Sequence, residues 1–314
     1  MIAAYETTVR PPRSATSASR ILAPTDFSPI SKTAVDAAVS MLAGNSEASL
    51  TLLHVVEPTA PRGDEDACGA DRPGTLSSHV NYGDRRMRQL RSTYGDIRGL
   101  ETRIVAGHAA RSICDIARDE SYDLIVMSSH GNSGLAKVII GSVAEHVVQE
   151  SPCAVLVVKP PKNPAGELTL GPVPVKFERL LVGYDHRAGA RRALDTAWEL
   201  AGAGKNHITL VHVLEPSPNL PDCQVEPQLC AERIRDALAQ LTDVRARRLP
   251  SANDWDLRVE IGNPGDVIVR IARETGSELI VLGPHEHTRW GHSYVGSTAQ
   301  RVVRLSSCPV LVVK

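Results

Sequence analysis

The sequence predicts an α/β protein made of two tandem, doubly wound domains, each built on a five-stranded parallel sheet. Three observations support this fold class: an internal repeat, short apolar runs rich in Val, Ile and Leu, and amphipathic stretches between those runs. Strands buried on both faces of a parallel sheet have such continuous apolar runs, and crossover helices separate them along the chain. With 314 residues, the chain is long enough for two domains of ordinary size.

The internal repeat consists of similar segments that occur in the same order in both halves of the chain. Residues 20–26 (RILAPTD) match 179–185 (RLLVGYD), and residues 51–58 (TLLHVVEP) match 209–216 (TLVHVLEP). Both halves end in VLVVK. A preserved order of matches indicates a duplicated structural unit, and a stretch rich in Pro and Gly indicates a linker. We therefore predict a disordered tail over 1–19, domain one over 20–160, a linker over 161–175 and domain two over 176–314.

The pattern of apolar residues predicts the elements of domain one. In residues 31–42 apolar side chains recur every three or four positions, which indicates a helix, with Ser28 as its N-cap and Pro29 in its first turn. Right-handed crossovers between parallel strands place a ligand crevice where the winding reverses, here between the first and fourth strands. The last strand of each domain is apolar and lies at a sheet edge, which favours pairing. The expected strands are 21–24, 50–56, 101–106, 124–127 and 154–158.

The composition argues against several functional classes. A net charge of −1 provides no global attraction to nucleic acid, and 4% aromatic residues leave few platforms for base stacking. No run of about 18 apolar residues is present, so no membrane span is predicted. The six cysteines lack CxxC spacing, and we expect free thiols in a cytoplasmic protein. Phosphate-loop, dinucleotide-fingerprint and nucleophile-elbow motifs are also absent from the sequence.

The residues after the first and fourth strands carry the chemistry of the predicted site. Residues 24–26 (PTD) follow the first strand, and residues 128–131 (SSHG) follow the fourth. Nine residues later, residues 141–142 (GS) open a helix. Glycine allows the backbone to approach a ligand closely, and a helix N-terminus presents unpaired N–H groups to phosphate. Across the crevice, Asp26 can accept a hydrogen bond from an adenine amine or a ribose hydroxyl.

This set, together with residues 54–55 (HV), resembles the ATP-binding residues of the universal stress protein family. The resemblance covers nearly all of 20–160 and 176–314, although Ser128 stands where the family has glycine. It implies the adenine-nucleotide alpha-hydrolase-like fold with flavodoxin-like winding, and a cytoplasmic stress-response role. It also implies ATP, or AMP or ADP, as ligand, together with Mg²⁺. Family members pair their last strands across a dimer, so we expect an internal pseudo-dimer here, and a homodimer of the whole chain stays open.

The resemblance also assigns residues to the ligand. Asp26 and Val55 would line the adenine and ribose, beside Pro24 and Thr25. Met127 and Ser128 would lie beside the ribose and the phosphates. The triphosphate would lie against Gly131, Gly141, Ser142 and Val143.

Domain two departs further from this pattern. Glu286 stands where domain one has Gly131, and a carboxylate 4 Å from a phosphate costs about 1 kcal/mol in water and about 4 kcal/mol at an effective dielectric near 20. We therefore expect domain one to be the better site. Three histidines flank Glu286 on an expected irregular loop, but a fourth ligand is not evident, so we predict no metal site. The counterpart residues are Asp185, Val213, Gly283, Gly296, Ser297 and Thr298, and the histidines are His285, His287 and His292.

Three functional classes stay open from the sequence. The leading one is a nucleotide-dependent sensor or signalling module. A slow ATPase or autophosphorylating enzyme would need a base or phosphoacceptor, for which only the hydroxyls of Ser129 and Ser142 lie near. A nucleotide-free scaffold would use the repeat only for dimerisation.

Two further segments have a structural interpretation. The connection 57–77 is either a lid over the crevice or disordered. The arginine run at 85–91 is expected to be a solvated helix face.

Overall fold

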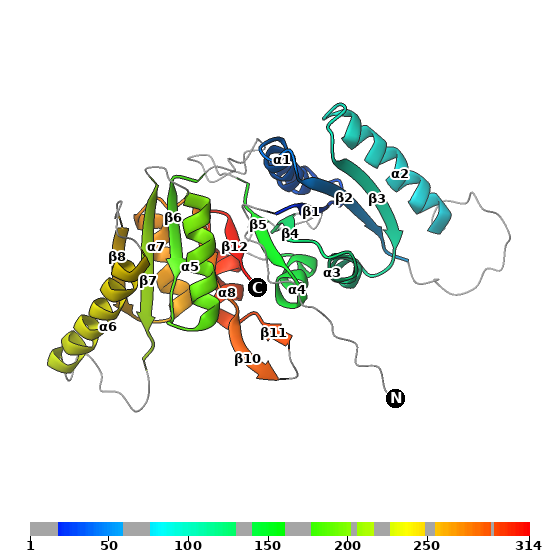
Figure 1. The fold of residues 1–314 in the computed structure, drawn as a ribbon. Helices are drawn as coiled ribbons and strands as arrows, with labels where there is room; N and C mark the ends of the chain where they lie inside the picture. Colours follow the sequence, from blue (N-terminus) through cyan, green and yellow to red (C-terminus); the bar gives the residue numbers. More distant parts are fainter. Residues whose placement is uncertain are drawn as a thin grey trace, which may run out of the picture.

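The computed structural model describes residues 18–58, 76–129, 140–160, 177–201, 206–216, 227–248, 255–289 and 292–314. In this part of the chain the two domains share one ten-stranded sheet (Figure 1). Domain one contributes β1 (Arg20–Pro24), β2 (Ser49–Val56), β3 (Leu100–Ala106), β4 (Leu124–Ser128) and β5 (Ala154–Val158). Domain two contributes β6 (Arg179–Gly183), β7 (His207–Leu214), β8 (Trp255–Ile261), β9 (Leu279–Leu282) and β12 (Val310–Val312).

The strand order is β3-β2-β1-β4-β5-β12-β9-β6-β7-β8. Neighbouring strands are parallel within each domain, and β1 lies between β2 and β4 as the doubly wound topology requires. At the junction β5 and β12 pair antiparallel, with Leu156 opposite Leu311. The predicted fold class and the internal pseudo-dimer are therefore confirmed. All five strand predictions in domain one agree with the structure to within one residue.

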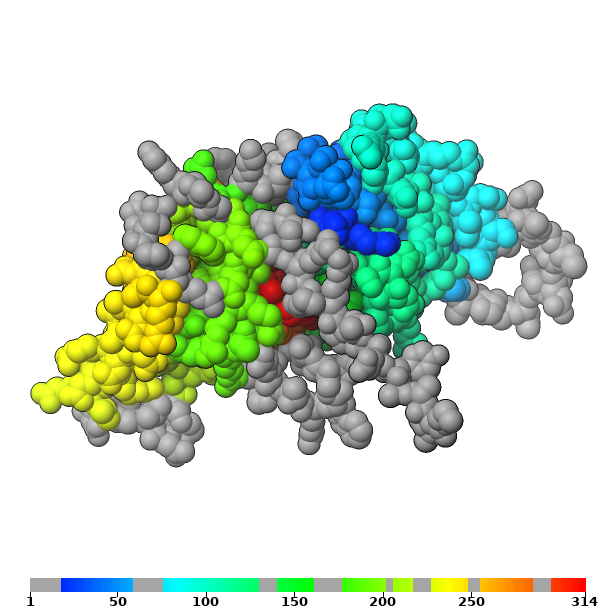
Figure 2. All heavy atoms as spheres, viewed as in Figure 1, coloured from blue at the N-terminus to red at the C-terminus, as the bar shows by residue number. Residues whose placement is uncertain are grey.

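Helices cover both faces of this sheet. One face carries α1 (Pro29–Ala43), α2 (Leu76–Ser92), α5 (Ala188–Ala201) and α6 (Pro227–Arg248). The other carries α3 (Ala109–Asp119), α4 (Ser142–Glu150), α7 (Pro264–Glu274) and α8 (Ser297–Leu305). Each face has a hydrophobic core that extends through both domains, because the central strands are apolar on both sides. In Figure 2 the last residues, in red, are visible between the two domains.

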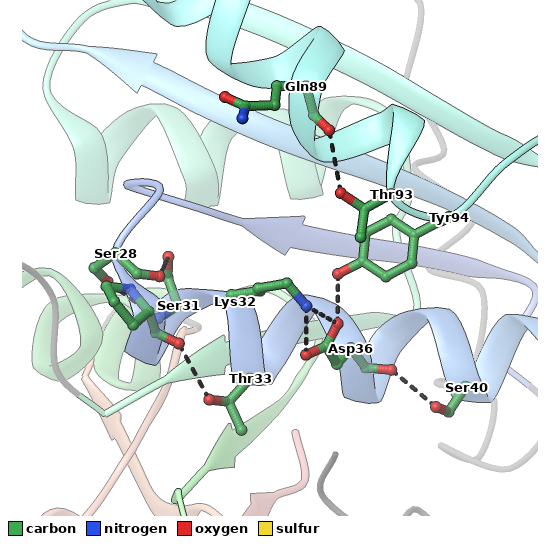
Figure 3. A network of polar contacts seen from close by, with 10 residues as sticks. Ser28, Ser31, Lys32, Thr33, Asp36, Ser40, Gln89, Thr93 and Tyr94 are labelled. Carbon is green, nitrogen blue, oxygen red and sulfur yellow. Dashed lines mark hydrogen bonds and ion pairs between the residues drawn. The ribbon is translucent and has the colours of Figure 1, made fainter. Parts of the chain in front are cut away.

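The start of α1 follows the predicted capping pattern. The Ser28 hydroxyl accepts a hydrogen bond from the Ser31 N–H at 3.0 Å, and Pro29 occupies the first turn. Further along α1, the Asp36 carboxylate pairs with Lys32 at 2.7 Å and accepts a hydrogen bond from the Tyr94 hydroxyl (Figure 3). Since Tyr94 follows α2, this contact ties the two helices on one face together.

Two expectations were wrong. The predicted irregular loop in domain two forms two short antiparallel strands, β10 (His285–Arg289) and β11 (His292–Tyr294). These segments are largely polar and lack the apolar alternation that indicates a strand. Cys230 is disulfide-bonded, whereas Cys114, Cys153 and Cys308 are free thiols as expected. None of the described helices has the length and apolarity that crossing a membrane requires.

Candidate functional site

Domain one contains a pocket of about 310 Å³ at the carboxyl ends of β1 and β4. Its place agrees with the crevice expected at the reversal of the winding. The structure brings the following predicted residues together around it: Pro24, Thr25, Asp26, Val55, Met127, Ser128, Gly141, Ser142 and Val143. Gly131 lies outside the described residues. His54 and Ser129, both named from the sequence, also line the pocket. The lining residues that the sequence did not indicate are Ser31, Leu53, Ala109, Ile113 and Ala144.

A hydrogen-bonded turn after β1 places Asp26 at the pocket. The Thr25 N–H donates to the Leu53 backbone oxygen at 2.8 Å, and Nδ1 of His54 donates to the Thr25 oxygen at 2.8 Å. One carboxylate oxygen of Asp26 accepts from the Ser28 N–H at 3.0 Å, which closes the turn before α1. The ring of His54 therefore supports this turn and also lines the pocket.

The N-terminus of α4 forms another wall of the pocket. Gly141 is the N-cap residue, with extended backbone angles and no side-chain cap among the described residues. Its own N–H donates to the Ser129 oxygen at 2.8 Å, which anchors the start of the helix to the end of β4. The next residues, Ser142 and Val143, line the pocket. A helix start in this position directs N–H groups and the positive end of the helix dipole at a ligand.

The start of α3 is a second helix terminus at the same pocket, through Ala109. The Ala109 N–H donates to a carboxylate oxygen of Glu57 at 2.9 Å, so this acid is held by the backbone. Glu57 is not among the described lining residues. The sequence signal for this wall was the Gly-His-Ala stretch directly after β3, at the carboxyl edge of the sheet.

Helix α2 supports the turn from behind. A Cβ added at Gly83 would lie 2.9 Å from Cδ2 of His54, so glycine is required for this close packing. The rings of His54 and Phe27 are 4.3 Å apart, and the Arg86 guanidinium lies 5.7 Å from the Phe27 ring centre. Other members of the arginine run have local partners: Arg88 pairs with Asp84, and Arg91 donates to the Leu100 oxygen. The run therefore acts in packing and surface pairing.

Domain two has an equivalent pocket of about 360 Å³. Of the predicted counterparts, Asp185, Val213, Gly283, Gly296 and Thr298 line it, and Ser297 is not among the lining residues. The side chain of Glu286 and those of His285, His287 and His292 lie outside the described part. Gly283 has a structural reason for being glycine, since a Cβ there would lie 2.1 Å from the Gly189 backbone.

The two pockets differ in their charged lining residues. Pro264 occupies the position of Ala109 and has no N–H, and Asn263 caps α7 with its side chain at 3.1 Å from the Gly265 nitrogen. Glu215, the counterpart of Glu57, lines the pocket of domain two. Asp185 also lines it, with the Arg187 guanidinium 3.8 Å away.

A histidine replaces Phe27 in domain two but adds no positive charge. His186 has the same left-handed backbone, with φ of 66° against 63° at Phe27. Burial lowers the pKa of His186, and neighbouring His212 lowers it further. These effects outweigh the opposing effect of Asp185 and favour the neutral imidazole. Across the described residues, no group of three His, Cys, Asp or Glu side chains is arranged to hold a metal ion.

The duplicated sheet and its repeated pocket define a two-domain α/β protein with a cleft at each topological switch point. Residues 18–159 and 176–314 each match the model of the universal stress protein family. The chain belongs to the universal stress protein family.

Individual relatives agree with this assignment. A universal stress protein of Thermus aquaticus is 31% identical over 140 residues, which cover 44% of this chain and 99% of the relative. A Synechocystis universal stress protein is 34% identical over 132 residues, 41% of this chain and 79% of the relative. The crystal structure of a universal stress protein from Archaeoglobus fulgidus covers 95% of this chain and 99% of its own, with a TM-score of 0.61 and 21% identity.

Proposed function

We propose that this universal stress protein binds ATP with Mg²⁺, or AMP or ADP, in the pocket of domain one and acts as a stress-response sensor or signalling module. One observation carries the proposal: the start of α4, which has no side-chain cap among the described residues, and the Asp26 turn line the same pocket. The N–H groups at the start of α4 suit phosphate, and the Asp26 carboxylate suits a sugar hydroxyl or a base amine.

The remaining walls of the pocket support a nucleoside between these two ends. Leu53, Val55, Ile113 and Met127 provide apolar surface for a base. Asp26 is the only acidic residue among the described lining residues. This suits Mg²⁺ bound chiefly by phosphate oxygens and water, because Mg²⁺ at nucleotide sites takes few protein ligands.

Domain two fits a triphosphate less well. Its pocket presents the carboxylates of Glu215 and Asp185, and the one guanidinium among its lining residues lies close to Asp185. Each unpaired carboxylate near a phosphate disfavours binding. We therefore assign one strong nucleotide site to the duplicated chain.

Titration calorimetry of the full chain tests this function. ATP with Mg²⁺ should bind more tightly than tripolyphosphate with Mg²⁺, because the apolar walls contribute only when a base is present. GTP serves as a second control for the base. No heat and no thermal stabilisation at millimolar ATP would contradict the proposal, and equal affinity for tripolyphosphate would reduce it to a phosphate site. Phosphate release during the titration would indicate an enzymatic activity in addition.

A further inference from the structure

The C-terminal end of α4 has two carbonyl groups for which no backbone N–H among the described residues is a recorded donor. The Val148 carbonyl would normally accept from the residue four positions on, which is Pro152 and has no N–H. The donor expected for Gln149 is the N–H of Cys153, which instead donates to the Ser151 hydroxyl at 3.2 Å. This helix end therefore needs donors from elsewhere.

A lysine from domain two supplies them. Nζ of Lys314 donates to the Val148 oxygen at 2.9 Å and to the Gln149 oxygen at 3.1 Å. The antiparallel pairing of β12 with β5 brings it there, because Val312 lies opposite Val155 at the start of β5, just after α4. Figure 1 accordingly marks the C-terminus beside α4. A cation at a helix C-terminus also interacts favourably with the helix dipole.

The other end of the same helix belongs to the pocket of domain one. Helix α4 has nine residues, and its N-terminal residues Ser142 and Val143 line the pocket. We propose that Lys314 is a positioning residue: by capping α4 from domain two, it holds the phosphate-facing end of α4 in place in domain one. This inference rests on the proposed nucleotide site and adds to it a dependence on the other domain.

The equivalent helix of domain two, α8, ends differently. After α8, Ser306 is followed by Ser307, whereas after α4 the equivalent Ser151 is followed by Pro152. Domain two therefore has a backbone N–H at the position where domain one has none. Arg273 of domain two donates to the Leu305 oxygen at the end of α8, at 3.2 Å. Its counterpart in domain one, Arg118, pairs with Asp115 at 2.8 Å instead. The symmetry-related lysine, Lys159, is therefore the matched control.

The test compares Lys314→Met, Lys314→Arg and Lys159→Met by hydrogen exchange and by ATP titration. Lys314→Met should speed exchange in the last turn of α4 and weaken ATP binding about 3- to 10-fold, as expected when a binding-competent helix is less populated. Lys314→Arg keeps the donors and should restore both within about twofold. Lys159→Met should leave α4 exchange and ATP affinity within about twofold.

Global stability is a poor readout for this role. Burial lowers the pKa of Lys314 to about 8, so its removal also relieves the cost of a buried charge. If Lys314→Met does not fold, hydrogen exchange of the wild-type chain with and without ATP is measured instead. Because coupling between two sites is reciprocal, ATP bound at the start of α4 should slow exchange in its last turn.

Three results would overturn the inference. The first is unchanged α4 exchange in Lys314→Met, and the second is faster exchange with unchanged ATP affinity. The third, for a variant that does not fold, is an ATP-insensitive last turn of α4 in the wild type. If the wild-type chain binds no ATP, the proposed function fails, and the cap itself is judged on the exchange of the variant alone.

Discussion

The Ala109 N–H donates to the Glu57 carboxylate at 2.9 Å, and this contact holds an acidic side chain at the start of α3. In domain two the same position is Pro264, which cannot donate, and Glu215 lines the pocket. A single change of residue type thus accompanies a different number of carboxylates lining the two pockets. Because Glu215 itself lines the pocket, its effect on ATP affinity can be tested by a substitution that leaves Glu286 in place.

We expect Glu215→Gln to raise the affinity of domain two for ATP. The Glu215 side chain is exposed and screened, so the gain should be modest, about two- to fivefold. The measurement is calorimetry in a Gly141→Asp background, which disables domain one. Glu57→Gln in the otherwise wild-type chain is the matched control and should leave the affinity of domain one within about twofold, because the Ala109 N–H already holds this carboxylate. A gain in domain one as large as the gain of Glu215→Gln in domain two would show that the Ala109 contact does not matter.

Gly141→Asp should remove ATP binding in domain one without unfolding it. Aspartate is a favourable N-cap residue, so α4 is retained, but its carboxylate would occupy the helix end that faces phosphate. We expect a loss of at least about tenfold in affinity. Gly296→Asp makes the same change in domain two and should leave the strong site within about twofold. Loss of half of the strong sites in Gly296→Asp would show that the domains are equivalent.

The β5–β12 junction should contribute strongly to stability. Leu156 and Leu311 lie opposite each other and are 4% and 2% exposed. Truncation of either to alanine should lower the free energy of unfolding by about 2–5 kcal/mol in chemical denaturation. Leu229→Ala is the control, because that side chain is 38% exposed and should cost less than about 1 kcal/mol. A cost below 1 kcal/mol at both junction positions would contradict the shared core.

Cys153 should be unreactive in the folded chain at pH 8. Burial raises the pKa of its thiol from 9.0 to about 11, and only the thiolate is alkylated. The raised pKa contributes stability below pH 9 that is lost as the pH rises through 11. Lys314 has a lowered pKa, so its contribution to the free energy of unfolding changes in the opposite direction: stability rises as the pH increases from 8 to 10.5.

The difference in unfolding free energy between wild type and Cys153→Ala therefore isolates the thiol, and it should shrink between pH 9 and 11. The difference should be flat below pH 9. Rapid alkylation of the native protein at pH 8, at the rate of the unfolded chain, would be inconsistent with a buried thiol.

The sequence predicted the strands, the α1 cap at Ser28 and the crevice because these follow from local periodicity and from chain order. The remaining features depend on contacts between distant residues. Glu57 meets Ala109 only after β2 and β3 pair, and Lys314 reaches Val148 only through the junction of the two domains. The β10–β11 pair was not predicted because its largely polar residues lack the apolar alternation that indicates a strand.

The number of ATP molecules bound per chain at saturation tests the central claim most directly. Full-length protein, stripped of nucleotide, is titrated with ATP and Mg²⁺ at a protein concentration well above the dissociation constant. One strong site in domain one predicts a ratio near one, which falls to near zero in Gly141→Asp and stays near one in Gly296→Asp. A ratio near two, or no binding, would contradict the account.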